Sequence, residues 1–345
     1  MSDKKPKVLV AMSGGVDSSV SAALLLENGY EVIGGFMKNW SDCAWREDRR
    51  DAIRVAANLG IPLHTFDFEK EYRNAVVENL FSEYAALRTP NPDVLCNKHI
   101  KFDLFMREAD RLGCDFIATG HYARVQNGIL KKAVDENKDQ TYFLWAVPKT
   151  ALKRVIFPVG ELTKLQVRKK AKEVGLSVAQ KKDSQGICFI GEVSIFDFLK
   201  ERIAENPGAV VTTSGEKVGT HRGVAFYTIG QRQFTGAACG EPRYVVEKRK
   251  ETNELVVAGN YHPSLYKKSL QANQCNFFVN VREIIGAKIQ ARIRYRQSLV
   301  PCMISKYEVG DTVFVEFNSA QRAVTSGQSI VFYRGEECVG GGVIA

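Results

Sequence analysis

The first 120 residues alternate short apolar runs with segments of helical period. Residues 8–12 are a continuous apolar run, which predicts a buried strand, and apolar positions from Val16 to Leu24 then recur at helical spacing until Gly29. The series continues with strands at 31–37, 63–66 and 116–119 and with helices that end at Gly60 and Gly113. This order predicts an α/β fold, a doubly wound parallel sheet that binds ligands beyond the carboxyl ends of its strands.

The pattern changes after residues 206–208. Before that point, Thr163 with Gln166 three residues later predicts a capped helix, and a second helix is predicted at 196–203. Beyond it the chain contains short predicted strands separated by glycines, at 210–212, 225–229, 244–247, 255–258, 289–295, 303–305, 313–317 and 330–333. We therefore expect one domain at 1–205, a small β-rich domain at 206–273 and a C-terminal β-barrel domain at 274–345.

The composition narrows the class of protein. Hydrophobic residues make up 45% and charged residues 25%, and no apolar run approaches the ~18 residues that a membrane span needs. Residues 1–7 are polar and lead straight into the first strand, so we expect a cytoplasmic protein with no signal peptide and no membrane partner. The net charge of +9 permits a polyanionic partner without proving one.

A candidate phosphate-binding loop follows the first strand. Residues 13–19 read Ser-Gly-Gly-Val-Asp-Ser-Ser, and an amphipathic helix begins inside this segment. The glycines let the backbone approach an anion, the first N–H groups of the helix are unsatisfied, and the hydroxyls can donate to phosphate oxygens. The alternative is a glycine turn that only caps a helix. The lysine of G-x-x-x-x-G-K-[ST] is absent, which disfavours an NTPase that transfers the γ-phosphate.

Two of the eight cysteines are candidates for chemistry. No C-x-x-C pair occurs, so a structural zinc ribbon is not expected. Cys96 and Cys188 each lie in a polar loop marked by proline or glycine, where helix N–H groups and nearby lysines can lower the pKa of a thiol. Either cysteine alone would be interpreted as structural, whereas the pair favours function. Cys43 is excluded from the site, and packing roles are expected for Cys114, Cys239, Cys275, Cys302 and Cys338.

A basic segment near the C-terminus alternates in polarity. In residues 288–296, Lys-Ile-Gln-Ala-Arg-Ile-Arg-Tyr-Arg, every even position is basic or Gln and every odd position is apolar or aromatic. Such alternation predicts a strand with one cationic face, which suits a phosphate backbone. A solvated barrel face is the alternative, because alternation alone says only which side is wet.

The phosphate loop resembles that of the PP-loop ATP pyrophosphatase superfamily, and further motifs narrow the resemblance. Two of them contain the candidate cysteines: Asn-Pro-Asp-Val-Leu-Cys-Asn-Lys at 91–98 and Asp-Ser-Gln-Gly-Ile-Cys-Phe-Ile-Gly at 183–191. The others follow in family order at 36–40, 118–124, 138–140, 227–232, 293–297, 326–328, 331–333 and 340–342. Through almost its whole length the chain is similar to the MnmA-type tRNA 2-thiouridylases.

The resemblance implies that ATP with Mg²⁺ is cleaved between its α- and β-phosphates to adenylate a substrate oxygen. Asp17 would help to hold Mg²⁺, and Ser13 and Ser18 would hold the leaving pyrophosphate. The nucleotide-binding residues that it implies are Ala11, Met12, Ser13, Gly14, Gly15, Val16, Asp17, Ser18, Met37 and Gly120.

The resemblance also implies 2-thiolation of a uridine at the wobble position of tRNA. Asn91, Pro92 and Asp93 would hold the target base, with Asp93 as acid or base. A persulfide on Cys188 would attack C2, and Cys96 would then attack the Cys188 sulfur and leave a Cys96–Cys188 disulfide. An iron–sulfur cluster held by Asp93, Cys96 and Cys188 is an open alternative, which the missing C-x-x-C spacing disfavours.

The implied partners are tRNA and a sulfur donor. By resemblance, the tRNA contacts are His121, Lys138, Asp139, Gln140, Arg294, Tyr295 and Gln328. The expected substrates are the Lys, Glu and Gln tRNAs, and the donor is a cysteine desulfurase or a sulfur-relay protein. Two other classes stay open: another PP-loop adenylating enzyme, such as one that amidates, and a non-catalytic RNA-binding protein that uses ATP as a structural ligand.

Overall fold

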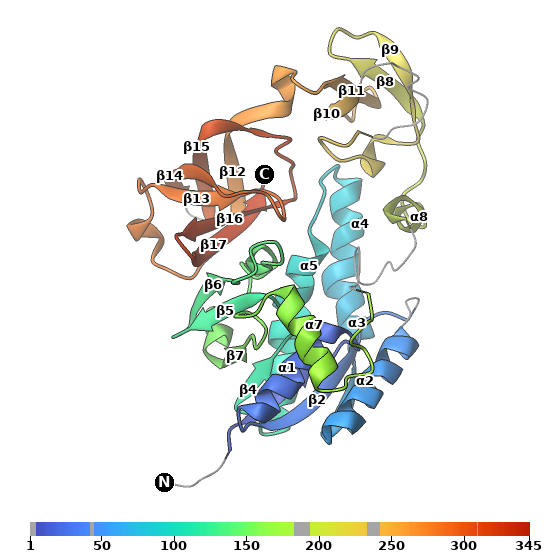
Figure 1. The fold of residues 1–345 in the computed structure, drawn as a ribbon. Helices are drawn as coiled ribbons and strands as arrows, with labels where there is room; N and C mark the ends of the chain where they lie inside the picture. The colour runs from blue at the N-terminus through green and yellow to red at the C-terminus, as the bar shows by residue number, and fades with distance from the viewer. Residues whose placement is uncertain (1–4, 42–44, 183–193, 233–241, 309) are drawn as a thin grey trace. The chain divides into compact units, whose positions relative to one another are not determined.

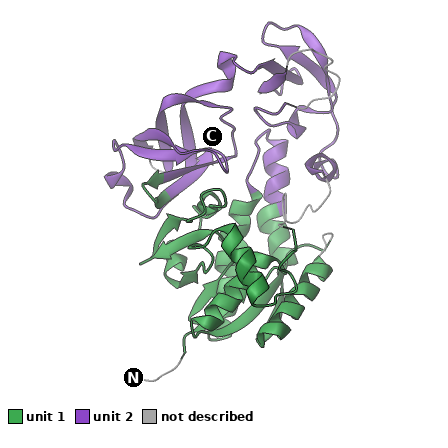
Figure 2. Cartoon of the chain, in the orientation of Figure 1, with its two compact units in different colours: residues 1–76, 92–191, 333–339 green, residues 77–91, 192–332, 340–345 purple. Residues whose placement is uncertain are grey.

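The structure, a computed structural model, describes residues 5–41, 45–182, 194–232, 242–308 and 310–345. The chain divides into two compact units, each assembled from separate stretches of sequence (Figure 2). The first unit comprises Met1–Val76, Pro92–Gly191 and Tyr333–Val339, and the second comprises Val77–Asn91, Glu192–Phe332 and Gly340–Ala345. Within the described ranges, no helix has the length and apolar character needed to cross a bilayer.

A five-stranded parallel sheet forms the centre of the first unit (Figure 1). Its strands are β1 (Lys7–Ala11), β2 (Glu31–Lys38), β3 (Leu63–Asp67), β4 (Phe116–Ala118) and β7 (Val155–Ile156). They lie in the order β3-β2-β1-β4-β7, and every pair is parallel. The α/β prediction is therefore confirmed, and β1 lies in the middle of the sheet because residues 8–11 are apolar on both faces.

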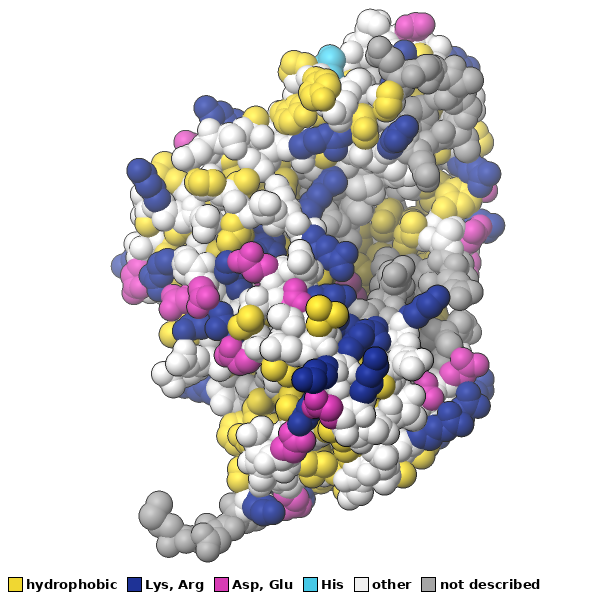
Figure 3. All heavy atoms as spheres, in the orientation of Figure 1, with side chains coloured by type: hydrophobic (Ala, Val, Ile, Leu, Met, Phe, Trp, Pro, Cys, Tyr) yellow, Lys and Arg dark blue, Asp and Glu magenta, His cyan; other side chains and the backbone are white. Residues whose placement is uncertain are grey.

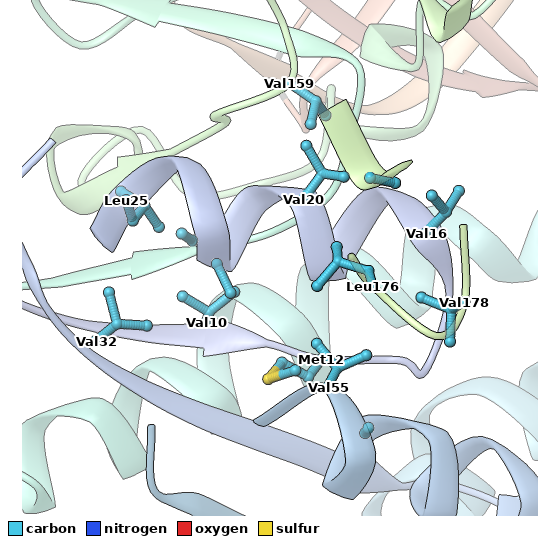
Figure 4. Packing of buried hydrophobic residues seen from close by; sticks show 14 of the residues in the cluster. Val10, Met12, Val16, Val20, Leu25, Val32, Val55, Val159, Leu176 and Val178 are labelled. Carbon is cyan, nitrogen blue, oxygen red and sulfur yellow. The ribbon is translucent and has the colours of Figure 1, made fainter. Parts of the chain in front are cut away.

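Three helices of this unit cover the region around β1. They are α1 (Val16–Glu27), α2 (Trp45–Leu59) and α7 (Lys164–Glu173). Val10 of β1 packs in one buried cluster with Val20 and Leu25 of α1 and with Leu176 beyond α7 (Figure 4). The capping box predicted for α7 is present, since the N–H of Gln166 donates to the Thr163 side chain and Gln166 accepts from the Thr163 N–H.

A long helical stretch precedes β4. Its segments are α3 (Glu69–Tyr72), the π-helical η1 (Arg73–Val77), α4 (Glu78–Ala85), α5 (Pro92–Leu95), the π-helical η2 (Cys96–Leu104) and α6 (Phe105–Arg111). The helix predicted to end at Gly113 therefore begins earlier than its apolar period indicates, at Pro92. Proline is favoured at the first position of a helix because its missing N–H would have no partner there.

The second unit contains a four-stranded sheet in the order β10-β11-β8-β9. Its strands are β8 (Gly208–Thr212), β9 (Lys217–His221), β10 (Arg243–Arg249) and β11 (Glu254–Gly259), and α8 (Ile195–Leu199) precedes them. The strand predicted at 225–229 is wrong. A 3-10 turn, η5 (Val224–Phe226), occupies this place between Gly223 and Gly230, which both have positive φ and bend the backbone out of an extended course.

Six strands close into a barrel at the C-terminal end of the chain, as predicted. They are β12 (Tyr266–Phe277), β13 (Ile289–Arg292), β14 (Val300–Glu308), β15 (Thr312–Arg322), β16 (Ser329–Arg334) and β17 (Glu337–Ile344). The order is β12-β15-β14-β13-β16-β17, and pairing of β12 with β17 closes the ring. The hairpin of β5 (Ala123–Gln126) and β6 (Ile129–Lys132) extends from β17 through Lys131 and Glu337. The predicted domain boundary at 273/274 falls inside β12.

Short 3-10 turns connect several of these elements. They are η3 (Thr141–Phe143), η4 (Ala151–Arg154), η6 (Pro263–Leu265) and η7 (Val281–Glu283).

The basic segment at 288–296 is shorter as a strand than its alternation predicts. β13 ends at Arg292, and a turn follows in which the Ile293 N–H donates to the Gln297 side chain and Arg296 has a φ of +63°. Arg292 is buried, with 6% of its surface exposed. The prediction of a single exposed cationic face is therefore wrong, because a side-chain hydrogen bond turns the backbone after four strand residues.

Candidate nucleotide and thiolation site

The phosphate loop joins β1 to α1 at the carboxyl end of the central strand. Gly14 has a φ of +74°, and a Cβ atom there would lie 2.2 Å from the backbone oxygen of Asp48 at the start of α2. No other residue fits this position without moving α2. Within the described residues no side chain caps α1 at Gly15, so the first turn of α1 presents N–H groups that suit an anion.

Serine hydroxyls fill the interior of this loop. The Ser18 hydroxyl donates to the Gly15 carbonyl at 3.0 Å and accepts from the Ser13 N–H at 3.2 Å. The Ser19 hydroxyl also donates to the Gly15 carbonyl, at 2.8 Å. Ser13 is exposed, and its oxygen lies 3.2 Å from that of Ser18. The Ser18 and Ser19 hydroxyls thus hold the loop together through the Gly15 carbonyl, and binding of phosphate by the loop stays a prediction.

The carboxylate of Asp17, the residue predicted to bind Mg²⁺, accepts hydrogen bonds from a lysine ammonium and a tyrosine hydroxyl. Lys164, the first residue of α7, donates from Nζ to both carboxylate oxygens at 2.7 and 2.8 Å, and the Tyr122 hydroxyl donates to Oδ1 at 2.9 Å. Only 12% of the Lys164 side chain is exposed. A carboxylate oxygen is a suitable Mg²⁺ ligand, but the described residues contain no group of three or more ligating side chains. Binding of Mg²⁺ by Asp17 stays a prediction.

Lys181 connects the phosphate loop to α2. Its Nζ donates to the Gly14 carbonyl at 3.1 Å and to the carboxylates of Asp48 and Asp51 at 2.8 and 2.7 Å. Burial alone would lower the pKa of Lys181, but the two ion pairs raise it overall. The sequence analysis missed Lys164 and Lys181 because their partners lie 130 or more positions away, and no local pattern signals such pairs.

The predicted adenine residues lie at the carboxyl ends of neighbouring strands. Ala11 and Met12 are buried at the end of β1, and Met37 is half-buried near the end of β2. Gly120 follows β4, and a Cβ atom there would lie 2.7 Å from the Ser18 backbone nitrogen. Gly120 thus lets the end of β4 approach the first turn of α1. The placement agrees with the rule for ligand sites in parallel sheets, and adenine contact stays a prediction.

Asp93 and Cys96 lie three residues apart on one continuous helical stretch. Asp93 is in the first turn of α5, and Cys96 is the first residue of η2 and is buried, with 5% exposed. Burial raises the pKa of the Asp93 carboxyl, partly opposed by the charge of Lys101. Residues three apart on a helix share a face, so the acid and the thiol lie on the same side of this stretch, and their function in one site stays a prediction. Cys188, its predicted partner, lies outside the described residues, as does Cys43.

The residues that flank this pair are packed. Pro92 is buried, and Asn91 is half-buried before it. Asn97 is buried and donates from Nδ2 to the Phe143 carbonyl at 2.9 Å, which fixes the start of η2 against the turn at 141–143. π-Helical turns often mark functional sites, and here one begins at the predicted nucleophile.

Packing roles are confirmed for the four described cysteines that the sequence analysis assigned to them. Cys114, Cys275, Cys302 and Cys338 are buried. Burial raises the pKa of Cys275 and of Cys302 to about 12, so neither has a useful thiolate fraction at neutral pH.

Of the four predicted tRNA contacts in the first unit, two are buried and two are half-buried. Asp139 is 1% exposed, and its carboxylate accepts from the Thr141 hydroxyl and from the N–H groups of Ala133 and Thr141. His121 is buried with Nδ1 2.7 Å from the Thr119 hydroxyl, and burial lowers its pKa well below 6.5. Lys138 and Gln140 are half-buried and lie in the same turn as Asp139.

The predicted tRNA contacts in the second unit engage backbone carbonyls. Arg294 donates from one terminal nitrogen to Ile229 and Ala323, each at 3.1 Å. The Gln328 amide donates to the carbonyls of Thr89 and Pro90 at 2.9 and 3.2 Å. Tyr295 is half-buried, with the Arg296 guanidinium 5.2 Å from its ring centroid. Arg294 and Gln328 therefore organise backbone in this structure.

The surface drawn in Figure 3 gives no single basic patch. Lysine and arginine side chains are interspersed with aspartate and glutamate over this face.

Three family models match successive parts of the chain. They describe a tRNA methyl transferase HUP domain at residues 6–192, a tRNA methyl transferase PRC-barrel domain at 196–259 and an aminomethyltransferase β-barrel domain at 267–344. Curated relatives match nearly end to end. A tRNA-specific 2-thiouridylase MnmA from Pseudomonas savastanoi pv. phaseolicola is 48% identical over 98% of this chain and 94% of its own length. The chain belongs to the MnmA family.

A second MnmA relative, from Pseudomonas putida strain GB-1, is 49% identical over 99% of this chain and 95% of its own length. The resemblance inferred from the motifs is thus confirmed. The domain descriptions mention methyl transfer, whereas the relatives that span the whole chain are named as thiouridylases. A solved 4-thiouridine synthetase–RNA complex has a TM-score of 0.39 at 19% identity, over 57% of this chain and 50% of that chain.

Proposed function

We propose that this protein is a tRNA sulfurtransferase that replaces the C2 oxygen of a wobble uridine with sulfur at the expense of ATP. The observation that carries the proposal is the pairing, in one compact unit, of a preorganised phosphate loop with a buried acid and thiol, Asp93 and Cys96. Membership of the MnmA family supports it, since its curated relatives are named tRNA-specific 2-thiouridylases.

The first step activates the base. Oxygen on C2 of a uracil is a poor leaving group, so the enzyme first converts it into part of a better one. The C2 oxygen attacks the α-phosphorus of ATP, the α–β P–O bond breaks, and pyrophosphate leaves. Gly14, Gly15 and the first turn of α1 supply N–H groups for the departing phosphates. Mg²⁺ would bind the phosphates with Asp17 and neutralise charge on them. Asp93, whose pKa is raised, would donate and accept the proton at N3 of the base.

The second step transfers sulfur. The terminal sulfur of a persulfide on Cys188 attacks C2, and the C2–O bond breaks as AMP leaves. The Cys96 thiolate then attacks the Cys188 sulfur, and the S–S bond to the base-bound sulfur breaks. The products are 2-thiouridine and a Cys96–Cys188 disulfide, which a thiol reductant must reduce before the next turnover. A sulfur donor of the desulfurase or relay class must also rebuild the persulfide.

The test is a complete reaction with product analysis. Purified protein, ATP, Mg²⁺, unmodified tRNA, a cysteine desulfurase with cysteine, and a thiol reductant are incubated, and the nucleosides are analysed by mass spectrometry while AMP and pyrophosphate are quantified. We expect 2-thiouridine and equal amounts of AMP and pyrophosphate, formed only with tRNA. Absence of tRNA-dependent AMP would reject the enzyme in favour of an RNA-binding protein that holds ATP structurally.

Two rival chemistries give different results in the same assay. Cys188→Ser protein that still modifies its substrate would indicate another PP-loop adenylating enzyme, such as an amidating one. Activity that requires iron and is lost in iron-free protein would indicate a cluster on Asp93, Cys96 and Cys188. The expected substrates are tRNAs for Lys, Glu and Gln, and the expected compartment is the cytoplasm.

A further inference from the structure

A continuous series of hydrogen bonds joins the 138–141 turn to the phosphate loop, inside the first compact unit. Gln140 and Tyr122 exchange two bonds: the Gln140 N–H donates to the Tyr122 carbonyl at 2.8 Å, and the Tyr122 N–H donates to Oε1 of Gln140 at 2.9 Å. The Tyr122 hydroxyl then donates to Oδ1 of Asp17 at 2.9 Å. One residue therefore touches both the predicted tRNA turn and the predicted Mg²⁺ ligand.

The turn itself is rigidly built. Asp139 is buried and its carboxylate accepts from Thr141 and from the Ala133 N–H, which fixes the backbone on both sides of Gln140. The Thr141 hydroxyl also lies 3.0 Å from the Tyr333 hydroxyl. These bonds tie Ala133, Asp139 and Thr141 together on both sides of Gln140 in a buried polar network.

Tyr122 is equally constrained. Only 2% of its surface is exposed, and Lys164 Nζ lies 5.8 Å from its ring centroid while bonding to the same carboxylate. Lys164 accounts for one bond to each oxygen of Asp17, and Tyr122 supplies the additional bond to Oδ1 alone. The tyrosine hydroxyl thus selects the orientation of a carboxylate that the lysine holds symmetrically.

We propose that Tyr122 is a positioning residue that couples tRNA binding at the 138–140 turn to the orientation of Asp17, and so to ATP binding. This inference rests on the proposed function, because it needs tRNA at the turn and Mg²⁺–ATP at the loop. The bound tRNA restrains Gln140, Gln140 restrains the Tyr122 backbone, and the tyrosine hydroxyl holds Oδ1 of Asp17. Such a connection lets cognate tRNA tighten nucleotide binding before adenylation.

The experiment measures the ratio of two dissociation constants of an ATP analogue, the one without tRNA over the one with tRNA. The dissociation constant of an ATP analogue with a methylene group between the α- and β-phosphorus atoms is determined with Mg²⁺, without tRNA and with saturating unmodified tRNA. In wild-type protein we expect tRNA to tighten the analogue by at least about fivefold, the lower end of ordinary coupling between sites. In Tyr122→Phe, which loses only the hydroxyl, the ratio falls below about twofold while each ligand still binds alone.

The control is Tyr266→Phe, which removes a tyrosine hydroxyl bonded to the Asn260 carbonyl in the second unit. It should keep the wild-type ratio. Should Tyr122→Phe fail to fold, Gln140→Met removes one of the two bonds between Gln140 and Tyr122, the one from the Tyr122 N–H to Oε1, and should also lower the ratio. A wild-type ratio in a folded Tyr122→Phe protein overturns the inference, as does wild-type protein that binds both ligands without coupling. Wild-type protein that binds neither ligand overturns the proposed function itself.

Discussion

At Gly14 the phosphate loop passes so close to α2 that a hydrogen atom is the largest side chain that fits. The Asp48 carbonyl would lie 2.2 Å from a Cβ atom there. The sequence indicates this glycine through its place between a strand and a helix. It does not reveal that α2, more than thirty residues later, supplies the obstructing atom.

Gly14→Ala should therefore remove nucleotide binding and destabilise the fold. The positive φ alone costs ~1–3 kcal/mol for a residue other than glycine, and the clash with Asp48 displaces α2 in addition. The matched control is Gly29→Ala, at a φ of +81° with nothing within 4 Å of the new atom. Chemical denaturation and ATP titration check both variants. Equal loss of stability in the two would contradict the steric argument.

Asp93→Asn should separate stability from activity. The raised pKa means that the folded protein holds a proton on Asp93 at pH values where the unfolded chain has lost it, above about 3.8. Wild-type stability therefore declines as pH rises through that window, and the variant lacks this decline. We expect the free energy of unfolding of the variant, compared with that of the wild-type protein, to be higher at pH 8 than at pH 3. Formation of 2-thiouridine should fall by ~10²–10⁴-fold.

The control for Asp93→Asn is Asp103→Asn. Asp103 lies in η2, and its half-buried carboxylate pairs with Arg107 of α6. It should leave the activity close to the wild-type value. Denaturation at several pH values and nucleoside analysis provide the measurements. Full activity in Asp93→Asn would remove this residue from the mechanism.

At the scale of elements, residues 179–181, which follow α7, are hydrogen-bonded both to α7 and to the phosphate loop. Arg168 of α7 donates to the carbonyls of Ala179 and Lys181, and the Lys181 side chain bonds Gly14 and α2. The helix periods predict α2 and α7 as separate elements. Their connection through Lys181 depends on the order of strands in the sheet.

Lys181→Met should loosen this connection and weaken ATP binding. Without the Lys181 ammonium, the carboxylates of Asp48 and Asp51 would be unneutralised next to the phosphate loop, where they would repel the phosphates of ATP. Because the three side chains are partly exposed, we expect a loss of stability of at most about 1 kcal/mol. Repulsion should raise the dissociation constant of ATP by roughly tenfold, equivalent to ~1.4 kcal/mol. Lys169→Met, which removes an exposed ion pair on α7, is the control, and wild-type ATP affinity in Lys181→Met would contradict the argument.

For the whole molecule, the distributed charge predicts a salt-dependent interaction with tRNA. Each phosphate neutralised in a protein–nucleic acid complex contributes ~0.7–0.9 to the slope of log affinity against log salt. Lys138→Gln should lower the slope by about one such contribution, whereas Lys149→Gln, an exposed lysine outside the predicted contacts, should not. Filter binding at several salt concentrations measures the slope. An unchanged slope in Lys138→Gln would remove that residue from the interface.

Local patterns determined much of the architecture. Strand and helix periods, the glycine stops and the Thr163–Gln166 cap predict the strands and helices of the first unit, because neighbouring residues determine where each element forms, and their alternation predicts a parallel sheet. Prediction failed at 225–229 and 293–295, where glycine conformations and one glutamine side chain bend apolar alternating segments out of a strand. The loop motif and the Asp93–Cys96 spacing likewise follow from adjacent positions.

Only the tertiary structure revealed the partners of the loop. Tyr122, Lys164 and Lys181 reach it across 105, 147 and 167 positions of sequence. It also placed Asp139 and His121 in buried surroundings, although their polar character alone indicates exposure. The reason is physical: periodicity reports which side of an element is buried, whereas an ion pair or a buried carboxylate depends on which distant elements the sheet order brings together.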